Sequence, residues 1–374
     1  MLAAPLCAQR LTGNPTLTSA TVLKLLPPSE GNPRNTEGAF VTLKDGRILF
    51  AYSRFAGTSD HAAATIVGRF SADGGKTWTA TDTPIVGNEG GMNVMSVSLL
   101  RLADGRIALF YLRKNSLGDC RPYLRYSTDE ARTWSEPVLC ITEPGYYVLN
   151  NDRVIQLRNG RLIAPVAQHS TKESDYGSRG KAMAYLSDDA GKTWRRSRTT
   201  LECPTASGAG FQEPGVVELK DGRVLMFIRT QLGSQYLSYS SDGGETWSEA
   251  RASAIRSPLS PASIKRVPST GDLLMVWNDH STIDESFRAA DSDGRRTGGK
   301  RTPLTVAVSR DEGATWTHAH DLLASPTGWY CYSAIHFVGN RVLLAFASGG
   351  DGLPGLSKMD LAYFDLDSLK APAR

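Results

Sequence analysis

The chain has 374 residues and a formal net charge of +4, from 42 basic and 38 acidic side chains. This near balance, with no basic run interleaved with aromatic residues, argues against a nucleic-acid-binding protein. No apolar run reaches the roughly 18 residues of a membrane-spanning helix, and the five cysteines lack the spacing of metal ligands. We therefore expect no membrane span, no metal and no cofactor.

The first 18 residues form a separate N-terminal segment. It begins MLAAPLCAQ and includes a small-residue pattern like a signal cleavage site, without a full apolar stretch. Two interpretations stay open: the stub of a secretory leader, or a terminal segment without structure. The first predicts a secreted or periplasmic protein.

Residues 19–374 show one repeated pattern and are interpreted as a single domain. A strand-like run at Thr21–Leu26 comes first. Six hairpins follow, with Asp-Gly, Asn-Gly, Gly-Asn or similar turns between apolar runs. They lie at Leu43–Phe50, Leu102–Phe110, Leu157–Pro165, Leu219–Phe227, Ser269–Trp277 and Val338–Phe346.

An eight-residue pattern, Ser-x-Asp-x-Gly-x-Thr-Trp, alternates with the hairpins. The Asp accepts hydrogen bonds from the turn, the Gly tolerates positive φ, and the Trp re-enters a strand to pack between sheets. The second copy has Ala131 at the Gly position, which predicts local strain. The five copies are Ser71–Trp78, Ser127–Trp134, Ser187–Trp194, Ser240–Trp247 and Ser309–Trp316.

The spacing of these turns predicts the architecture. The Trp residues are about 53 to 69 apart, a period typical of propeller blades. Only one strand, Met359–Phe364, follows the last hairpin, so Thr21–Leu26 is expected to complete the last sheet. The predicted fold is all-β: a six-bladed β-propeller of four-stranded antiparallel blades, with the N-terminal strand closing the last blade.

The repeated turns and the polar segments before the hairpins resemble the sialidase (neuraminidase) family, six-bladed propellers with Asp-box turns of this kind. Non-catalytic carbohydrate-binding propellers share such turns, so the site residues discriminate better. The resemblance implies that Asp60, in SRFAGTSDHAAATIV, is the acid/base. It implies that Tyr332, in WYCYSAIHF, is the nucleophile and that Glu213, in FQEPGVVEL, assists it.

The resemblance also implies arginines that bind a substrate carboxylate. Arg34, before the first hairpin, and Arg301, before the last Asp box, match two of the three family arginines, and Arg54 matches a further one. At the position expected for the remaining arginine of the three stands Gln235, and nearby Arg229 is an alternative.

Two further carboxylates complete the set of candidate substrate-binding residues. Glu37 follows Arg34 where the family has no acidic residue, and Asp152, in LNNDRVIQL, is a candidate for binding sugar hydroxyls or for a structural role.

These residue types suit glycoside hydrolysis. An acid must protonate the leaving oxygen while a group on the opposite face attacks the anomeric carbon. A substrate with a carboxylate on that carbon repels a carboxylate nucleophile, which favours a Tyr hydroxyl activated by a Glu. A retaining route through Tyr332 is expected, and an inverting route with Glu37 or Glu213 as the base stays open.

The predicted function is that of an exo-acting glycoside hydrolase that releases a terminal anionic sugar, with sialic acid expected, from a glycan or sialoside substrate. Two alternatives stay open: a propeller glycosidase for another acidic or neutral sugar, and a carbohydrate-binding propeller without chemistry. Cys120 and Cys140, which flank the second Asp box, are either a disulfide or two buried thiols.

Overall fold

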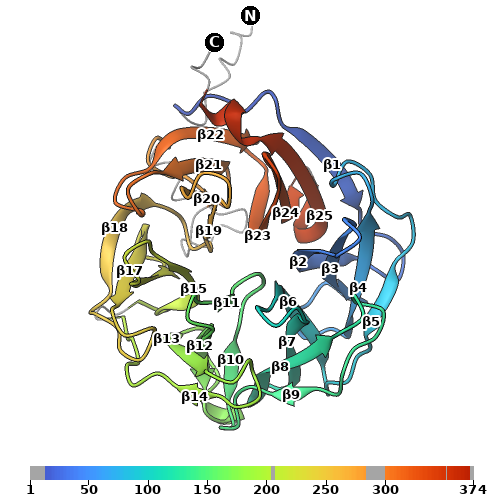
Figure 1. The fold of residues 1–374 in the computed structure, drawn as a ribbon, viewed down its shortest axis with the longest axis vertical. Coiled ribbons are helices and arrows are strands. Elements are labelled where there is room, and N and C mark those ends of the chain that lie inside the picture. Colours follow the sequence, from blue (N-terminus) through green and yellow to red (C-terminus); the bar gives the residue numbers. More distant parts are fainter. Residues whose placement is uncertain (1–12, 204–206, 284–299, 351, 371–374) are drawn as a thin grey trace, which may run out of the picture.

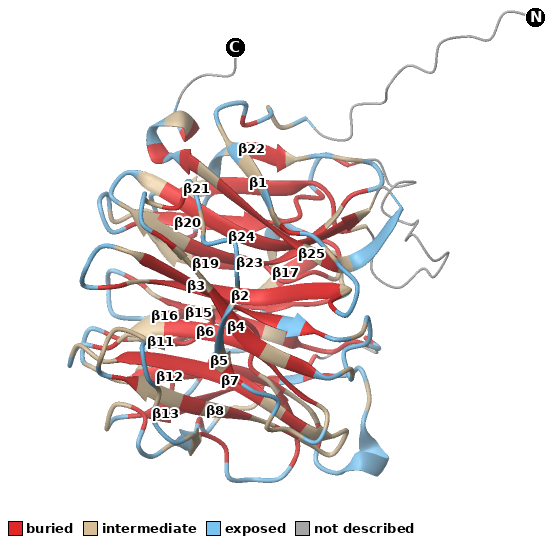
Figure 2. Cartoon of the chain, turned by 90° about the vertical axis from the view of Figure 1, so that its right-hand side faces the viewer, coloured by how far each residue is buried: buried red, intermediate tan, exposed pale blue. Residues whose placement is uncertain are grey.

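The computed structural model describes residues 13–203, 207–283, 300–350 and 352–370. Its sheets are arranged in a ring, and strands β2, β6, β15, β19 and β23 lie nearest the centre (Figure 1). Most strand residues are buried, whereas exposed residues gather at turns and rims (Figure 2). The predicted N-terminal segment lies mostly outside the described residues.

Three of the sheets each consist of four consecutive antiparallel strands. The first contains β2 (Arg34–Thr42), β3 (Ile48–Phe55), β4 (Ala64–Ser71) and β5 (Thr83–Val86). The second contains β15 (Gln212–Glu218), β16 (Val224–Arg229), β17 (Ser234–Ser240) and β18 (Arg251–Arg256). The third contains β19 (Ser263–Arg266), β20 (Leu273–Trp277), β21 (Leu304–Ser309) and β22 (Thr317–Leu323).

A nine-stranded sheet stands where two separate four-stranded sheets were expected. The two halves meet at one parallel pair, Tyr146 with Cys120, and the Cys120 N–H donates to the Gly145 carbonyl at 3.0 Å. The inner strand of the second half is interrupted between β10 and β11. The strands are β6 (Asn93–Arg101), β7 (Ile107–Ser116), β8 (Asp119–Ser127), β9 (Val138–Leu139), β10 (Tyr146–Val148), β11 (Ile155–Gln156), β12 (Leu162–Ser170), β13 (Lys181–Ser187) and β14 (Arg195–Arg196).

The last sheet combines the two ends of the chain. Strand β1 (Thr21–Leu26) pairs antiparallel with β25 (Leu353–Asp365), which pairs with β24 (Arg341–Gly350) and then β23 (Trp329–Val338). Strand β25 is longer than the Met359–Phe364 run expected from the sequence. The short 3-10 helices Glu173–Asp175 and Leu366–Leu369 are the helices of the described chain, and neither is long enough to cross a membrane.

Local sequence explains the hairpins and the Asp boxes. In the first hairpin the Gly46 N–H donates to the Leu43 carbonyl at 3.0 Å, with Gly46 at φ 84°, a backbone conformation that suits glycine. In the first Asp box, Asp73 accepts from the Thr77 N–H at 2.9 Å and Ser71 Oγ accepts from the Gly75 N–H at 2.9 Å. The other four boxes repeat these two contacts.

The five Asp-box tryptophans pack against the apolar clusters between neighbouring sheets, as expected. Cys120 and Cys140 are both buried as free thiols, so the disulfide alternative is wrong for this structure.

Candidate active site

One backbone feature recurs on the inner strands around the ring. Four of these strands, and the segment between β10 and β11, each carry a non-glycine residue at positive φ, and the ladders of β2, β6, β15 and β23 shift register there. Such bulges redirect side chains, and positive φ is uncommon outside glycine. The residues are Glu37 (φ 56°), Ser96 (62°), Asp152 (58°), Glu213 (42°) and Tyr332 (53°).

Two of these bulge residues, from sheets far apart in the sequence, contact each other. The Tyr332 hydroxyl donates to Glu213 Oε1 at 3.1 Å, and Arg229 Nη1 donates to Glu213 Oε2 at 2.6 Å. All three side chains are buried or nearly so. The predicted phenol and its carboxylate are therefore brought together, with Arg229 holding the second carboxylate oxygen.

The charges around this pair set its protonation. Burial raises the pKa of Glu213, but Arg229, Arg301 and Arg153 outweigh it and hold that pKa below its usual value. Burial, followed by the nearby Glu213 charge, raises the pKa of Tyr332 well above that of a free phenol. At neutral pH the pair is thus a neutral phenol beside a charged base.

Arg301 completes this half of the site. It is buried before β21, and its guanidinium carbon lies 5.5 Å from the centre of the Tyr332 ring and 5.0 Å from that of Trp329. The Tyr330 N–H donates to its backbone carbonyl at 2.8 Å, which fixes the segment against β23. Arg301 thus lies against the phenol, while Arg229 lies against its carboxylate partner Glu213.

The other half of the site is the pair of Arg34 and Asp60. Arg34 Nη1 lies 2.5 Å from Asp60 Oδ1 and donates to the Thr58 carbonyl at 3.2 Å, while its guanidinium stacks 4.4 Å from the Phe55 ring centre. The Arg34 side chain is 4% exposed and that of Asp60 is 60% exposed. The predicted acid is therefore a solvent-accessible carboxylate tied to a buried guanidinium.

Glu37 connects the two halves electrostatically. Its carboxyl is buried, accepts a short hydrogen bond from Ser96 Oγ, and interacts with the charges of Arg34, Asp60 and Glu213. Burial is the main cause that raises the pKa of Glu37 to about 7, against the lowering effect of Arg34. Near neutral pH this carboxyl therefore exchanges a proton.

Three predicted substrate-binding residues have other partners within the protein. Arg54 precedes Phe55 on β3, so strand alternation turns it to the opposite face, where its Nε lies 3.6 Å from Asp82. Gln235 is buried on β17, one strand further from the centre, and its Nε2 donates to Ser257 Oγ and the Ser260 carbonyl, both at 2.9 Å.

Asp152 is also used internally, because its two oxygens accept from Lys265 Nζ at 2.6 Å and from the Ile335 N–H at 2.9 Å. Arg54 therefore pairs with Asp82, Gln235 is hydrogen-bonded on β17, and Asp152 is held by Lys265 and the backbone of β23. The alternative residue Arg229 takes the place expected for Gln235.

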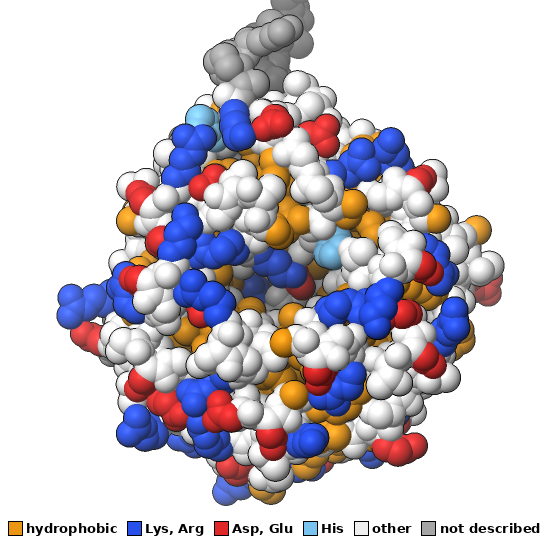
Figure 3. Space-filling model, in the orientation of Figure 1, with side chains coloured by type: hydrophobic (Ala, Val, Ile, Leu, Met, Phe, Trp, Pro, Cys, Tyr) orange, Lys and Arg blue, Asp and Glu red, His pale blue; other side chains and the backbone are white. Residues whose placement is uncertain are grey.

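Two basic residues that the sequence did not single out belong near the site. Lys114 Nζ donates to the Asp60 carbonyl at 2.7 Å, and Arg153 is a buried cation whose pKa burial lowers to about 10. The only sequence signal for Arg153 was its position beside Asp152 in a polar segment before a hairpin. Figure 3 shows Lys and Arg side chains in a hollow at the centre of one face of the ring.

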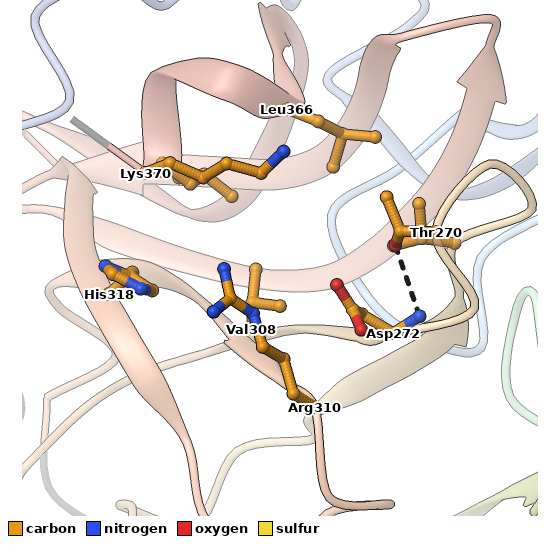
Figure 4. Close-up of a pocket in the computed structure, with 9 residues that line it drawn as sticks. Thr270, Asp272, Val308, Arg310, His318, Leu366 and Lys370 are labelled. Atoms are coloured by element: carbon orange, nitrogen blue, oxygen red, sulfur yellow. Dashed lines mark hydrogen bonds between the residues drawn. The ribbon is translucent and has the colours of Figure 1, made fainter.

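The described residues offer no metal centre as an alternative to this cluster, and a pocket at the outer side of the ring lies apart from it. Among the described residues, no group of three His, Cys, Asp or Glu side chains is placed to hold a metal ion. A pocket at the outer side of the ring, lined by Thr270, Asp272, Arg310 and His318 among others, contains none of the predicted residues (Figure 4).

Known proteins resemble this chain in sequence. The chain is 25% identical to a sialidase of Bacteroides fragilis over 342 residues, 81% of this chain and 58% of that protein. It is 29% identical to a sialidase of Micromonospora viridifaciens over 314 residues, 77% of this chain and 46% of that protein. The chain thus spans about half the length of these two relatives.

The fold is also known. The structure of the intramolecular trans-sialidase from Ruminococcus gnavus, in complex with oseltamivir carboxylate, superposes with a TM-score of 0.69 at 15% identity, covering 94% of this chain and 98% of that one. The architecture is that of the sialidase β-propellers. Residues 46–343 match the profile of the BNR repeat-like domain, and the chain therefore belongs to the BNR repeat-like domain family.

Proposed function

We propose that the protein is an exo-acting glycoside hydrolase that releases a terminal anionic sugar, with sialic acid as the preferred substrate. The observation that carries the proposal is the hydrogen bond from Tyr332 to Glu213 within a group of buried arginines. Its sialidase relatives support the same class of activity.

Three guanidinium groups would bind the sugar carboxylate. Those of Arg34, Arg229 and Arg301 are buried, and Arg34 Nε and Nη2 and Arg229 Nε have no hydrogen-bond partner. Buried donors are normally satisfied, so these N–H groups are suited to donate to a ligand oxygen. Planar guanidinium groups bind carboxylates through two parallel hydrogen bonds that lysine cannot reproduce.

The chemistry proceeds by double displacement. The Tyr332 oxygen attacks the anomeric carbon as its proton passes to Glu213, and Asp60 donates a proton to the departing oxygen. Asp60 then takes a proton from the water that releases the sugar from Tyr332, and Glu213 returns its proton to the phenol. The anomeric configuration is therefore retained. Glu37, whose pKa lies near 7, is the group suited to an inverting route.

The ring itself is proposed to contain six blades, with β1 closing the last one, as a single domain over residues 19–374. A secreted or periplasmic location is also part of the proposal.

Turnover tests the function directly. We expect a fluorogenic sialoside to be hydrolysed faster than the matching uronide and neutral glycosides, with the first sugar product in the α configuration by proton NMR. Absence of sialoside turnover with activity on another glycoside would overturn the assigned sugar. Ligand binding without any turnover would overturn the enzyme assignment.

A further inference from the structure

Arg34 is only partly satisfied within the protein. One nitrogen, Nη1, makes both of its polar contacts, to Asp60 Oδ1 at 2.5 Å and to the Thr58 carbonyl at 3.2 Å. The other two nitrogens are buried and have no partner. An incoming anion therefore has donors to bind on the same guanidinium that holds Asp60, and the two anions compete for one cation.

Asp60 is held firmly by its backbone but loosely by its side chain. Its carbonyl accepts from Asn93 Nδ2 at 2.9 Å and from Lys114 Nζ at 2.7 Å, which anchors the loop to β6 and β7. Its side chain is 60% exposed and forms an ion pair with Arg34. The carboxylate can thus leave Arg34 by rotation of the side chain, without movement of the loop.

The charges that face Asp60 are mostly positive. Burial raises the pKa of Asp60, but Arg34 first, and then Lys114 and His61, outweigh it and hold that pKa below its usual value. Glu37 and the phenols of Tyr146 and Tyr176 also interact with the Asp60 charge. Without a ligand, Asp60 therefore carries its negative charge at neutral pH and has no proton to donate.

We propose that Arg34 keeps Asp60 in its charged form until an anionic group of the sugar replaces Asp60 on the Arg34 guanidinium. The substrate's own carboxylate thereby allows Asp60 to take up the proton that it needs to act as the acid. This rests on the proposed function and adds a source of specificity to it. Once displaced, Asp60 loses its cation, gains a negative neighbour and takes one proton from solvent. It then gives that proton to the glycosidic oxygen as the bond breaks. A neutral sugar leaves the ion pair in place and the acid unprotonated.

The first test needs no ligand. Carbon-13 NMR would follow the titration of the Asp60 carboxyl in the parent and in Arg34→Met. We expect the pKa of Asp60 to rise by about one unit or more in the variant, because an adjacent arginine typically lowers a carboxyl pKa by about that amount. Arg54→Met is the matched control, since it removes the same charge from the same sheet at the Asp82 ion pair. An unchanged Asp60 titration in Arg34→Met would overturn the proposal.

The second test uses the intact site and a carboxylate ligand, 2,3-didehydro sialic acid. Calorimetric titrations at about pH 5.5 in buffers of different ionisation enthalpy measure protons taken up on binding. We expect uptake of up to about one proton by the parent and by Glu37→Gln, because Glu37 is already largely protonated at that pH. Asp60→Asn should bind the ligand without uptake.

The outcomes separate the two proposals. Binding without uptake by the parent, or equal uptake by Asp60→Asn, overturns the release of Asp60 while leaving the anion site intact. If the parent does not bind the ligand, the proposed sugar and the release step both fail, and the ligand-free titration still decides whether Arg34 controls Asp60.

Discussion

Tyr332 donates its hydroxyl proton to Glu213 at 3.1 Å across 119 residues of chain, and both residues lie at positive φ on an inner strand. Positive φ costs free energy for residues other than glycine and is found disproportionately at functional sites. The bulges in β15 and β23 aim the two side chains at each other. A phenol and its base are thereby held in contact before any substrate arrives.

Tyr332→Phe tests the nucleophile. We expect kcat on a sialoside to fall by at least about 10³-fold, since the base is left without a group to activate. Stability should fall by only about 1 kcal/mol, because Glu213 keeps its contact with Arg229. Tyr52→Phe is the control: it removes a 2.6 Å hydrogen bond to Asp82 away from the site and should leave kcat intact. Comparable turnover in the two variants would argue against a covalent role for Tyr332.

Arg229 and Gln235 should give opposite phenotypes. Arg229→Met is expected to raise KM for the sialoside about tenfold or more. It should also move the acidic limb of the pH dependence of kcat to higher pH, because the pKa of Glu213 rises without its nearest cation. Gln235→Leu should lower the free energy of unfolding by about 1 to 3 kcal/mol, because the Gln235 amide donates hydrogen bonds to Ser257 Oγ and to the Ser260 carbonyl. Its kcat and KM should stay unchanged. A raised KM in Gln235→Leu with a normal pH profile in Arg229→Met would reverse our assignment.

The sequence predicted the features that local chemistry determines. Asp-box turns and Gly-containing hairpins depend on a few neighbouring residues, so their positions could be predicted along the whole chain. The resemblance to sialidases also predicted roles for Asp60, Glu213 and Tyr332. The structure places Asp60 beside Arg34 and Tyr332 beside Glu213, and the Glu37 carboxyl interacts with the charges of Asp60 and Glu213.

The orientation of single side chains could not be predicted from the same patterns. Whether Arg34 or Arg54 faces the centre depends on strand alternation and on the register shift between Thr36 and Ala39. Gln235 and Arg229 lie on adjacent strands, and only the order of β15, β16 and β17 from the centre decides which one reaches Glu213. These orientations depend on the tertiary structure, which the spacing of the repeats in the sequence does not specify.

Glu37 gives the protein a specific pH dependence of stability. Its pKa is about 7 in the folded protein, above the ordinary 4.5, so the folded state binds the proton more tightly than the unfolded state does. The stabilisation is fully present below about pH 4.5 and is lost as the pH rises through 7, by up to about 3 kcal/mol. Urea unfolding at pH 5 and at pH 8 should show this loss in the parent and a smaller loss in Glu37→Gln. Equal losses in both proteins would show that Glu37 is ionised throughout.

Replacing Ala131 in the second Asp box by glycine should stabilise the protein. Ala131 lies at φ 63°, where the other four boxes have glycine at φ 86° to 94°. Ala131→Gly should raise the free energy of unfolding by roughly 1 kcal/mol, since the left-handed conformation costs about that much for a residue with a Cβ atom. The opposite change in the first Asp box, Gly75→Ala, should lower the free energy of unfolding, because the added Cβ would lie 2.6 Å from the Leu343 side chain. Thermal unfolding of the two variants checks both signs, and a lower Tm for Ala131→Gly would show that its methyl packing outweighs the strain.

Gly215 and Arg153 together test how the site keeps Glu213 charged. A Cβ at Gly215 would lie 2.2 Å from Phe227 Cζ and 2.7 Å from Arg153 Nη1, so the glycine leaves room for the guanidinium beside the Glu213 strand. Gly215→Ala should cost about 1 to 3 kcal/mol of stability through overpacking and should displace Arg153.

Because Arg153 contributes to the lowered pKa of Glu213, its displacement should move the acidic limb of the kcat profile to higher pH. Arg153→Met should reproduce that shift without the overpacking, since it removes the charge and leaves Gly215 in place. A pH profile identical to the parent in both variants, with kcat reduced only as far as folding is impaired, would mean that Arg153 supports the centre of the ring and has no electrostatic effect on Glu213.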